Sequence, residues 1–191
     1  MAKSVVYEKS FQHERQLLER LPGYVTNLLH EAGITFAGIS CVVCGTGPGS
    51  FTGARVAVMY GKSLAYALDV PVIGIPSFDA IAVTTQHKNR IVVCSSRRSE
   101  VIASAYKQGE MMAIAAPRSI ADLEINAWAA TMFAGQPFVI LGDLERLVTH
   151  KVAPKARDLT RLAMPRIVAA NFDDVDVLVP TYVATSFGGD L

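Results

Sequence analysis

The stretch Cys44-Gly45-Thr46-Gly47-Pro48-Gly49-Ser50-Phe51-Thr52-Gly53-Ala54-Arg55 decides how this chain folds. It follows a run at 39–44 that is typical of a buried strand, and it overlaps the start of a run at 52–68 that predicts a helix. Its glycines and proline favour a tight, irregular turn that leaves room for a close approach. Such a turn either directs backbone N–H groups toward an anion or lets another backbone segment come near. The function depends on which of the two applies.

Two common nucleotide-binding loops do not fit this stretch. A P-loop ends in Gly-Lys-Ser/Thr, so that its lysine reaches phosphate oxygens. Here the loop ends in Thr52-Gly53-Ala54, and the nearest lysine is Lys62, well along the helix. A dinucleotide-binding loop needs a third glycine where Ser50 stands and an acidic residue closing the second strand, whereas Asp69 precedes that strand. The spacing therefore disfavours nucleotide binding of either kind.

The expected helix carries a small residue at every fourth position: Gly53, Ala57, Gly61 and Ala65. This spacing places the four residues on one face. A glycine inside a helix costs roughly 1 kcal/mol relative to alanine, so a close contact with another element is expected to offset that cost. The contact is either packing within the same domain or pairing with a partner's helix, and the sequence leaves both open.

The order of the predicted elements indicates an α/β protein, because strands and helices alternate. The first lobe, at 1–88, is expected to hold strands at 3–9, 39–44 and 70–75, helices before Ala32 and at 52–68, and a helix from Phe78 with Ser77 as its N-cap. Pro22-Gly23 should kink or break the first helix. The second lobe, at 89–191, is expected to hold a hairpin at 90–95 and 100–107, helices near 121–133 and 157–170, and a strand at 138–141.

Several runs resemble one protein family. They are Gly47-Pro48-Gly49-Ser50-Phe51-Thr52-Gly53 with Arg55, Val70-Pro71 with Ile73-Gly74, Ser77-Phe78-Asp79-Ala80-Ile81-Ala82, and Pro180 with Tyr182-Val183. Together they closely resemble the TsaB family, also called YeaZ. The similarity is strong from about 39 to 82 and weak beyond 107.

The resemblance implies an actin-like, sugar-kinase-like (ribonuclease H-like) two-lobe fold. It also implies a non-catalytic subunit of the bacterial machinery that makes threonylcarbamoyladenosine in tRNA. The implied partners are a TsaD-like catalytic subunit and a TsaE-like ATPase, with tRNA reached only through the complex and a homodimer as a further state; no cofactor is implied. The implied partner interface comprises Gly47, Pro48, Gly49, Ser50, Phe51, Thr52, Gly53, Arg55, Ala57, Gly61 and Ala65.

The chain also departs from the family. Family members begin with a strand carrying Asp-Thr-Ser and then a second strand, whereas this chain starts at the third, so we expect a truncated N-terminal lobe. We then expect 4–8 to pair with 39–44, or a second molecule to cover that edge. Ser95 stands where the family's hairpin has an aspartate. Without these acidic elements a metal-bound nucleotide has few ligands, so neither metal nor ATPase activity is expected.

Composition limits the remaining options. A net charge of +1 argues against independent tRNA binding, and no apolar run is long enough to span a bilayer, so cytoplasm is the expected location. Cys41 and Cys44 are expected on opposite faces of a strand, as buried apolar residues and not as a metal half-site. The alternatives are a homodimeric actin-like binding module and an ATP-handling enzyme with degenerate phosphate sites.

Overall fold

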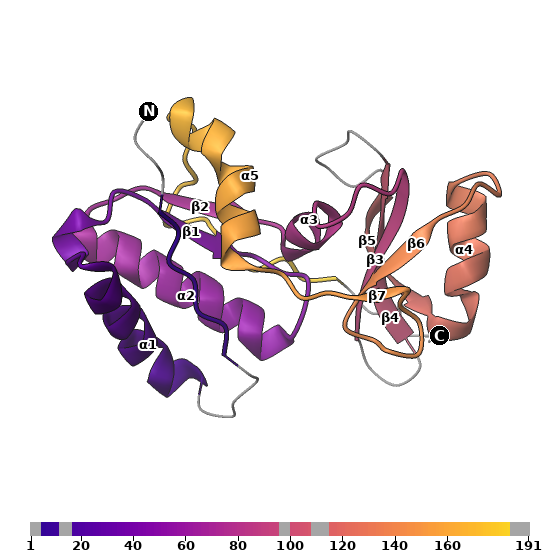
Figure 1. Ribbon diagram of the computed structural model, residues 1–191, viewed down its shortest axis with the longest axis horizontal. Helices are drawn as coiled ribbons and strands as arrows, with labels where there is room; N and C mark the ends of the chain where they lie inside the picture. The colour runs from indigo at the N-terminus through magenta and orange to yellow at the C-terminus, as the bar shows by residue number, and fades with distance from the viewer. Residues whose placement is uncertain (1–4, 12–16, 96–99, 108–114, 184–191) are drawn as a thin grey trace, which may run out of the picture.

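The computed structural model describes residues 5–11, 17–95, 100–107 and 115–183. The chain forms two lobes, one around a two-stranded sheet of order β1-β2 and one around a five-stranded sheet of order β5-β4-β3-β6-β7. Figure 1 shows the sheets side by side along the long axis of the molecule, with the short helix α3 between them.

The first lobe has three layers. Its strands β1 (Val42–Gly45) and β2 (Val72–Ile75) run parallel and are joined by α2 (Phe51–Leu68). Because side chains alternate along a strand, Cys44 packs with α2 on one face of the sheet, whereas Val43 packs with α5 (Ala156–Val168) on the other. The sheet is thus covered on both faces, as parallel sheets generally are.

The second helix layer of this lobe comes from the far end of the chain. Leu162 and Ala163 of α5 are buried against Ile73 and Ile75 of β2, and the segment after α5 continues along β2. There Asp173 N–H donates to the Val72 carbonyl at 3.0 Å. The prediction of a second lobe running from 89 to 191 therefore needs correction, since α5 covers the sheet face that α2 leaves bare.

The second lobe forms around β3 (Asn89–Ser95), which lies between β4 (Glu100–Lys107), antiparallel to it, and β6 (Val139–Gly142), parallel to it. The strands β5 (Ala115–Ala121) and β7 (His150–Lys151) form the edges. Helix α3 (Ser77–Ala82) packs on one face of this sheet and α4 (Ile125–Met132) on the other. Short 3-10 turns at Phe36–Gly38 and Asp122–Glu124 complete the described elements.

The long periodic elements agree with the sequence predictions, namely α2, the β3–β4 hairpin, β6 and α5. Two other predictions need correction. Helix α1 (Leu17–Ala32) continues through Pro22, so the break that was one of the two expected outcomes does not occur. Ser77 is the first residue of α3 and not its N-cap, which is Pro76.

The prediction of an N-terminal strand was also wrong. Residues 5–11 form no strand, and Val5 and Val6 are about 70% exposed. Instead, a Glu8 carboxylate oxygen accepts from the Arg157 backbone N–H at the start of α5, and Lys9 pairs with Glu31 of α1. Among the described strands β1 pairs only with β2, so residues 5–8 do not form the expected pairing with 39–44, and Ser4 lies outside the described residues. Coverage of that edge by a second molecule stays a prediction.

A buried polar network joins α3 to the second sheet. The Tyr106 hydroxyl donates to an Asp79 carboxylate oxygen at 2.6 Å. The guanidinium of Arg90, which is 6% exposed, donates to the carbonyls of Ala82 at 3.0 Å and Lys107 at 2.7 Å. Burial raises the pKa of Asp79, although the bond from Tyr106 opposes the rise. The network thus ties the C-terminal end of α3 to β3 and β4.

The raised pKa of Asp79 predicts a pH dependence of stability. A folded-state pKa above the unfolded value stabilises the fold below about pH 4, and this contribution is lost as the pH rises through the folded pKa. We therefore expect Asp79→Asn, which keeps an acceptor for Tyr106, to be more stable than wild type at neutral pH, with the difference shrinking toward pH 4. Urea denaturation from pH 4 to 8 measures this. Tyr106→Phe should steepen the dependence, and an unchanged pH profile in both variants would contradict the assignment.

Candidate functional site

The glycine loop uses its backbone N–H groups within the chain. Ser50 caps α2, its hydroxyl accepting from the Gly53 N–H at 3.3 Å and its carbonyl from the Ala54 N–H at 2.9 Å. The Gly47 N–H donates to the Ser77 hydroxyl at 3.1 Å, and the Ser77 N–H donates back to the Gly47 carbonyl at 2.7 Å. These three loop N–H groups are directed at protein acceptors, which disfavours a phosphate cradle.

The loop instead brings three backbone segments together. Gly47 has φ +91°, a region that favours glycine, and a Cβ there would lie 3.4 Å from the Thr181 carbonyl oxygen. Thr181 N–H donates to the Thr46 carbonyl at 2.7 Å, while a Cβ at Gly45 would lie 2.9 Å from the Ser77 hydroxyl. The sequence allowed two roles for this turn, anion binding by backbone N–H groups or close approach of another segment. The structure shows the second.

The small-residue face of α2 packs inside its own lobe at two of its four positions. A Cβ on Gly61 would lie 3.1 Å from the Cβ of Cys44 in β1, and Ala65 is 1% exposed. Gly61 and Ala65 therefore cannot contact a partner helix, which corrects the interface set at these positions. The sequence predicted a close contact that offsets the cost of a glycine in the helix. For Gly61 this contact is with β1 of the lobe's own sheet.

The other interface residues fall into groups by exposure. Gly47 and Pro48 are buried, Gly49, Gly53 and Ala57 are half-buried, and Ser50, Phe51, Thr52 and Arg55 are exposed. The exposed group lies at the start of α2. Of the implied interface set only these four are exposed, and their role as an interface stays a prediction.

The C-terminal segment lies beside the exposed face of α2. The Arg55 Nε donates to the Tyr182 hydroxyl at 2.8 Å, and its guanidinium lies 3.9 Å from the centre of the Phe51 ring. One turn further along α2, Met59 is 59% exposed. Residues 55, 59, 62 and 66 follow Phe51 on one side of the helix, and Lys62 anchors the segment by donating to the Leu178 carbonyl at 3.1 Å. We call the exposed residues Phe51, Arg55, Met59 and Tyr182 the α2 face.

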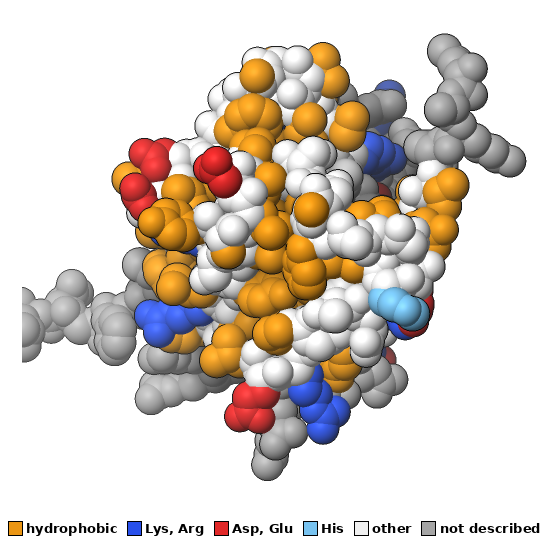
Figure 2. All heavy atoms as spheres, turned by 90° about the vertical axis from the view of Figure 1, so that its left-hand side faces the viewer, with side chains coloured by type: hydrophobic (Ala, Val, Ile, Leu, Met, Phe, Trp, Pro, Cys, Tyr) orange, Lys and Arg blue, Asp and Glu red, His pale blue; other side chains and the backbone are white. Residues whose placement is uncertain are grey.

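Apolar side chains are also exposed elsewhere on the first lobe. Figure 2 shows hydrophobic side chains gathered across the end of the molecule that this lobe forms. Tyr66 at the end of α2 is 79% exposed, and Val177 in the C-terminal segment is 69% exposed. A shallow hollow lined by Tyr66, Pro71 and Val175 lies on the same lobe. Contiguous exposed apolar surface of this kind commonly marks an interaction site.

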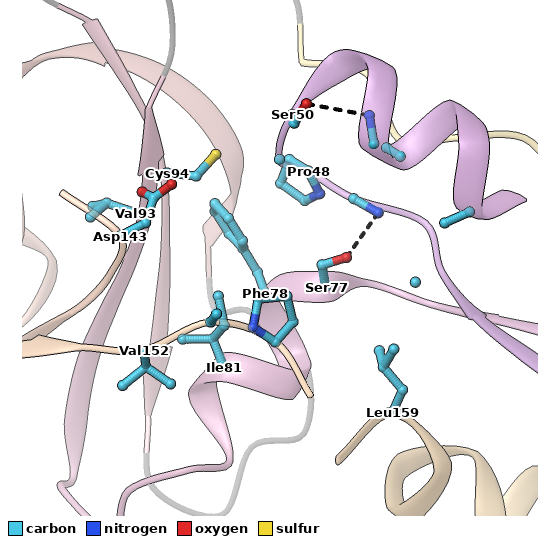
Figure 3. A pocket seen from close by; sticks show the side chains of 18 residues that line it. Pro48, Ser50, Ser77, Phe78, Ile81, Val93, Cys94, Asp143, Val152 and Leu159 are labelled. Carbon is cyan, nitrogen blue, oxygen red and sulfur yellow. Dashed lines mark hydrogen bonds between the residues drawn. The ribbon is translucent and has the colours of Figure 1, made fainter. Parts of the chain in front are cut away.

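A cleft of about 360 Å³ lies between the lobes, and we call it the interlobe cleft. The loop and α2 line one side, α3 lines the middle, and the ends of β3, β6 and β7 line the other side. Figure 3 shows Cys94 and Asp143 opposite Pro48 and Ser50, with the Phe78 side chain reaching between them. Asp143 directly follows β6, and ligand clefts of α/β sheets commonly lie at the carboxyl ends of strands, so this rule could have identified it from sequence.

Cys41 and Cys44 pack in different layers, as the sequence predicted, but Cys44 is buried whereas Cys41 is only half-buried and precedes β1. Cys44 packs in the α2 layer and Cys41 in the α5 layer, so the two thiols diverge. Burial raises the pKa of Cys44 to about 11 and that of Cys94 to about 12, with Asp143 adding to the latter. Both thiols are therefore protonated at neutral pH and poor nucleophiles. The described residues hold no group of three side chains suited to a metal ion. None of the described helices is long and apolar enough to cross a membrane.

The fold defines the class of protein: a mixed α/β protein of two lobes with the fold of YeaZ. A solved structure of YeaZ from Pseudomonas aeruginosa superposes with a TM-score of 0.67 at 22% identity, covering 90% of this chain and 87% of that one. A model of the family described as "TsaD: tRNA N6-adenosine threonylcarbamoyltransferase" matches residues 11–132, more than half of the chain. The chain belongs to this family, among the TsaB (YeaZ) proteins.

Curated relatives match over part of their length. TsaB of Bacillus subtilis is 31% identical over 85 residues, which are 44% of this chain and 37% of that protein. An uncharacterized protein of Mycobacterium leprae, ML0378, is 36% identical over 120 residues, which are 63% of this chain and 33% of that protein. The chain thus spans only about a third of the length of these two relatives.

Proposed function

We propose that this protein is a non-catalytic subunit of the complex that makes N6-threonylcarbamoyladenosine in tRNA, and that it pairs with a TsaD-like catalytic subunit. One observation carries the proposal: the N–H groups of Gly47, Gly53 and Ala54 bond within the chain and fix the start of α2 with the α2 face outward. A loop with these bonds positions the α2 face for an interaction, and phosphate binding is then expected in another protein of the complex. The relatives named TsaB support the same assignment.

The α2 face suits pairing for chemical reasons. Phe51 and Met59 expose 58% and 59% of their surface, and the Arg55 guanidinium covers the Phe51 ring. Aromatic residues, methionine and arginine are the types enriched at protein interfaces. Ser50 caps α2, Lys62 holds the C-terminal segment and Arg55 bonds to Tyr182, so these contacts exist before binding and need not be formed on association.

The remaining partners follow from the complex. A TsaE-like ATPase would join the pair, tRNA would be contacted through the catalytic subunit, and the complex would work in the cytoplasm. A net charge of +1 supports the indirect role toward tRNA, since proteins that bind tRNA independently usually carry a concentrated basic surface.

Size-exclusion chromatography of the chain mixed with the TsaD-like subunit of the same organism tests the pairing. We expect a peak that contains both proteins and elutes before either alone. The same apolar face could serve a homodimer, because an exposed patch that is self-complementary forms two-fold pairs. A chain that stays a homodimer when the catalytic subunit is added would favour the homodimeric binding module instead.

The proposal also predicts that the isolated chain does not hydrolyse ATP or cleave protein. Ser95 replaces the aspartate of the family's hairpin, and the described residues lining the interlobe cleft include no lysine or arginine that could neutralise a triphosphate. We therefore expect phosphate release equal to a no-enzyme control over hours at millimolar MgATP. Turnover that copurifies with the chain and persists after an added affinity step would contradict the non-catalytic assignment.

A further inference from the structure

We propose that the interlobe cleft binds a small organic cation with a flat apolar body, and that it is not a nucleotide site. This goes beyond the subunit role, because it assigns a ligand to a cavity which pairing through the α2 face does not use. The cleft volume of about 360 Å³ lies within the range of known small-molecule sites.

The position of the cleft favours a ligand site. Gly45 ends β1, Ser77 lies just beyond β2, Val93 and Cys94 lie near the end of β3, and Asp143 follows β6. Parallel strands of both sheets therefore direct their carboxyl ends at the same space. Side chains at this edge are held by rigid strands while the space between them stays open, which is why ligands of α/β proteins bind there.

The walls of the cleft are mostly apolar. Pro48 and Leu159 belong to the first lobe, Ile81 lies on α3, and Val152 and Pro154 follow β7, so apolar groups face the cleft from both lobes (Figure 3). A Cβ on Gly49 would meet no atom within 4 Å, so the loop leaves open space above these groups. A ring placed there would be enclosed by both lobes, and burying its apolar surface would supply most of the affinity.

The charge in the cleft sets the sign of the ligand. Among the described lining residues Asp143 is the only charged one. The nearby Lys151 is engaged with Glu145, with its ammonium 2.8 Å from that carboxylate. Asp143 is exposed, and Lys151 also interacts with it electrostatically, so the carboxylate attracts an ammonium and disfavours phosphate groups with the modest strength of a solvent-screened charge.

Two hydroxyl groups complete the site. The oxygens of Ser50 and Ser77 accept from the backbone N–H groups of Gly53 and Gly47, and this leaves each hydroxyl with a proton to donate. Both residues line the cleft on the side away from Asp143 (Figure 3). The arrangement therefore fits a molecule with an ammonium at one end, an aromatic or aliphatic ring in the middle and a hydrogen-bond acceptor at the other.

Titration of the ¹⁵N-labelled full chain, followed by NMR, tests the proposal with three probes: tryptamine, its uncharged alcohol analogue tryptophol, and MgATP. We expect tryptamine to shift the amide signals of Gly49, Asp143 and Val152, with a Kd about two- to fivefold below that of tryptophol, the range of an exposed ion pair. Asp143→Asn should remove the difference between the two probes. The control variant Glu124→Gln removes an equal charge from an exposed position of the second lobe outside the cleft and should keep the difference.

Three results would overturn the proposal. The first is no shift of cleft signals by either organic probe in the wild-type chain. The second is MgATP binding at the cleft more tightly than tryptamine. The third is an equal effect of Asp143→Asn and Glu124→Gln, which would show that the preference reflects only the net charge of the chain. Each can occur while the chain still pairs with a TsaD-like subunit, so this test and that of the subunit role fail independently.

Discussion

Gly142→Ala should lower the free energy of unfolding by about 3 kcal/mol or more, the range of severe backbone overpacking. A Cβ at this position would lie 2.0 Å from the Val93 carbonyl oxygen, and the residue has φ +147°. Val93 lies in β3, which is held between β4 and β6, so the carbonyl cannot move away without breaking one of the two ladders. We expect the variant to be largely insoluble or to unfold at much lower urea concentration.

A matched variant separates the contact from the backbone angle. Gly135 also has a positive φ, +74°, but a Cβ there would meet no atom within 4 Å. Gly135→Ala should therefore cost only the 1–2 kcal/mol or so of a left-handed alanine. Urea midpoints of the two variants, measured by circular dichroism, give the comparison. Equal midpoints would show that the close packing of β6 on β3 at Gly142 is wrong.

Met59→Glu should weaken binding to the TsaD-like subunit at least tenfold, roughly the loss expected when a central interface residue is replaced by a charge. Met59 lies in the middle of the α2 face and is 59% exposed, so the substitution should leave the fold intact. The carboxylate would have to be desolvated against the partner, and that cost falls on the complex alone.

The control for Met59→Glu is Leu123→Glu. Leu123 is 93% exposed and lies in the second lobe, so the same change of charge occurs far from the α2 face. Sedimentation or calorimetric titration of each variant with the catalytic subunit gives the affinities, and thermal unfolding confirms that both chains fold. If the two variants bind alike, the partner contacts some other surface of this chain.

The sequence predicted those parts of the fold that depend on local pattern. The run at 52–68 was predicted as a helix and forms most of α2, whereas its cap Ser50 was not identified from the sequence. The sequence also anticipated that its helix glycines need a close neighbour. It left open whether that neighbour was the lobe's own sheet, because this depends on where β1 lies relative to Gly61.

Long-range placement was where prediction failed. The run at 5–9 alternates like a strand, yet pairing also requires a free edge at the right place, and Glu8 and Lys9 instead contact α5 and α1. The return of α5 to the first lobe has no local signal, since an apolar stripe such as Leu159, Leu162 and Ala163 fits either sheet. The interlobe cleft was missed because its residues come from stretches far apart in the sequence, between Gly45 and Leu159.

Reconstituted tRNA modification tests the subunit assignment most directly. The TsaD-like and TsaE-like proteins of the same organism are combined with tRNA, ATP and a threonylcarbamoyl donor, and the modified nucleoside is quantified with and without this chain. We predict modification only when the chain is present, and its loss again with Met59→Glu but not with Leu123→Glu. Full modification in the absence of the chain, or none after its addition to an otherwise active system, would contradict the assignment.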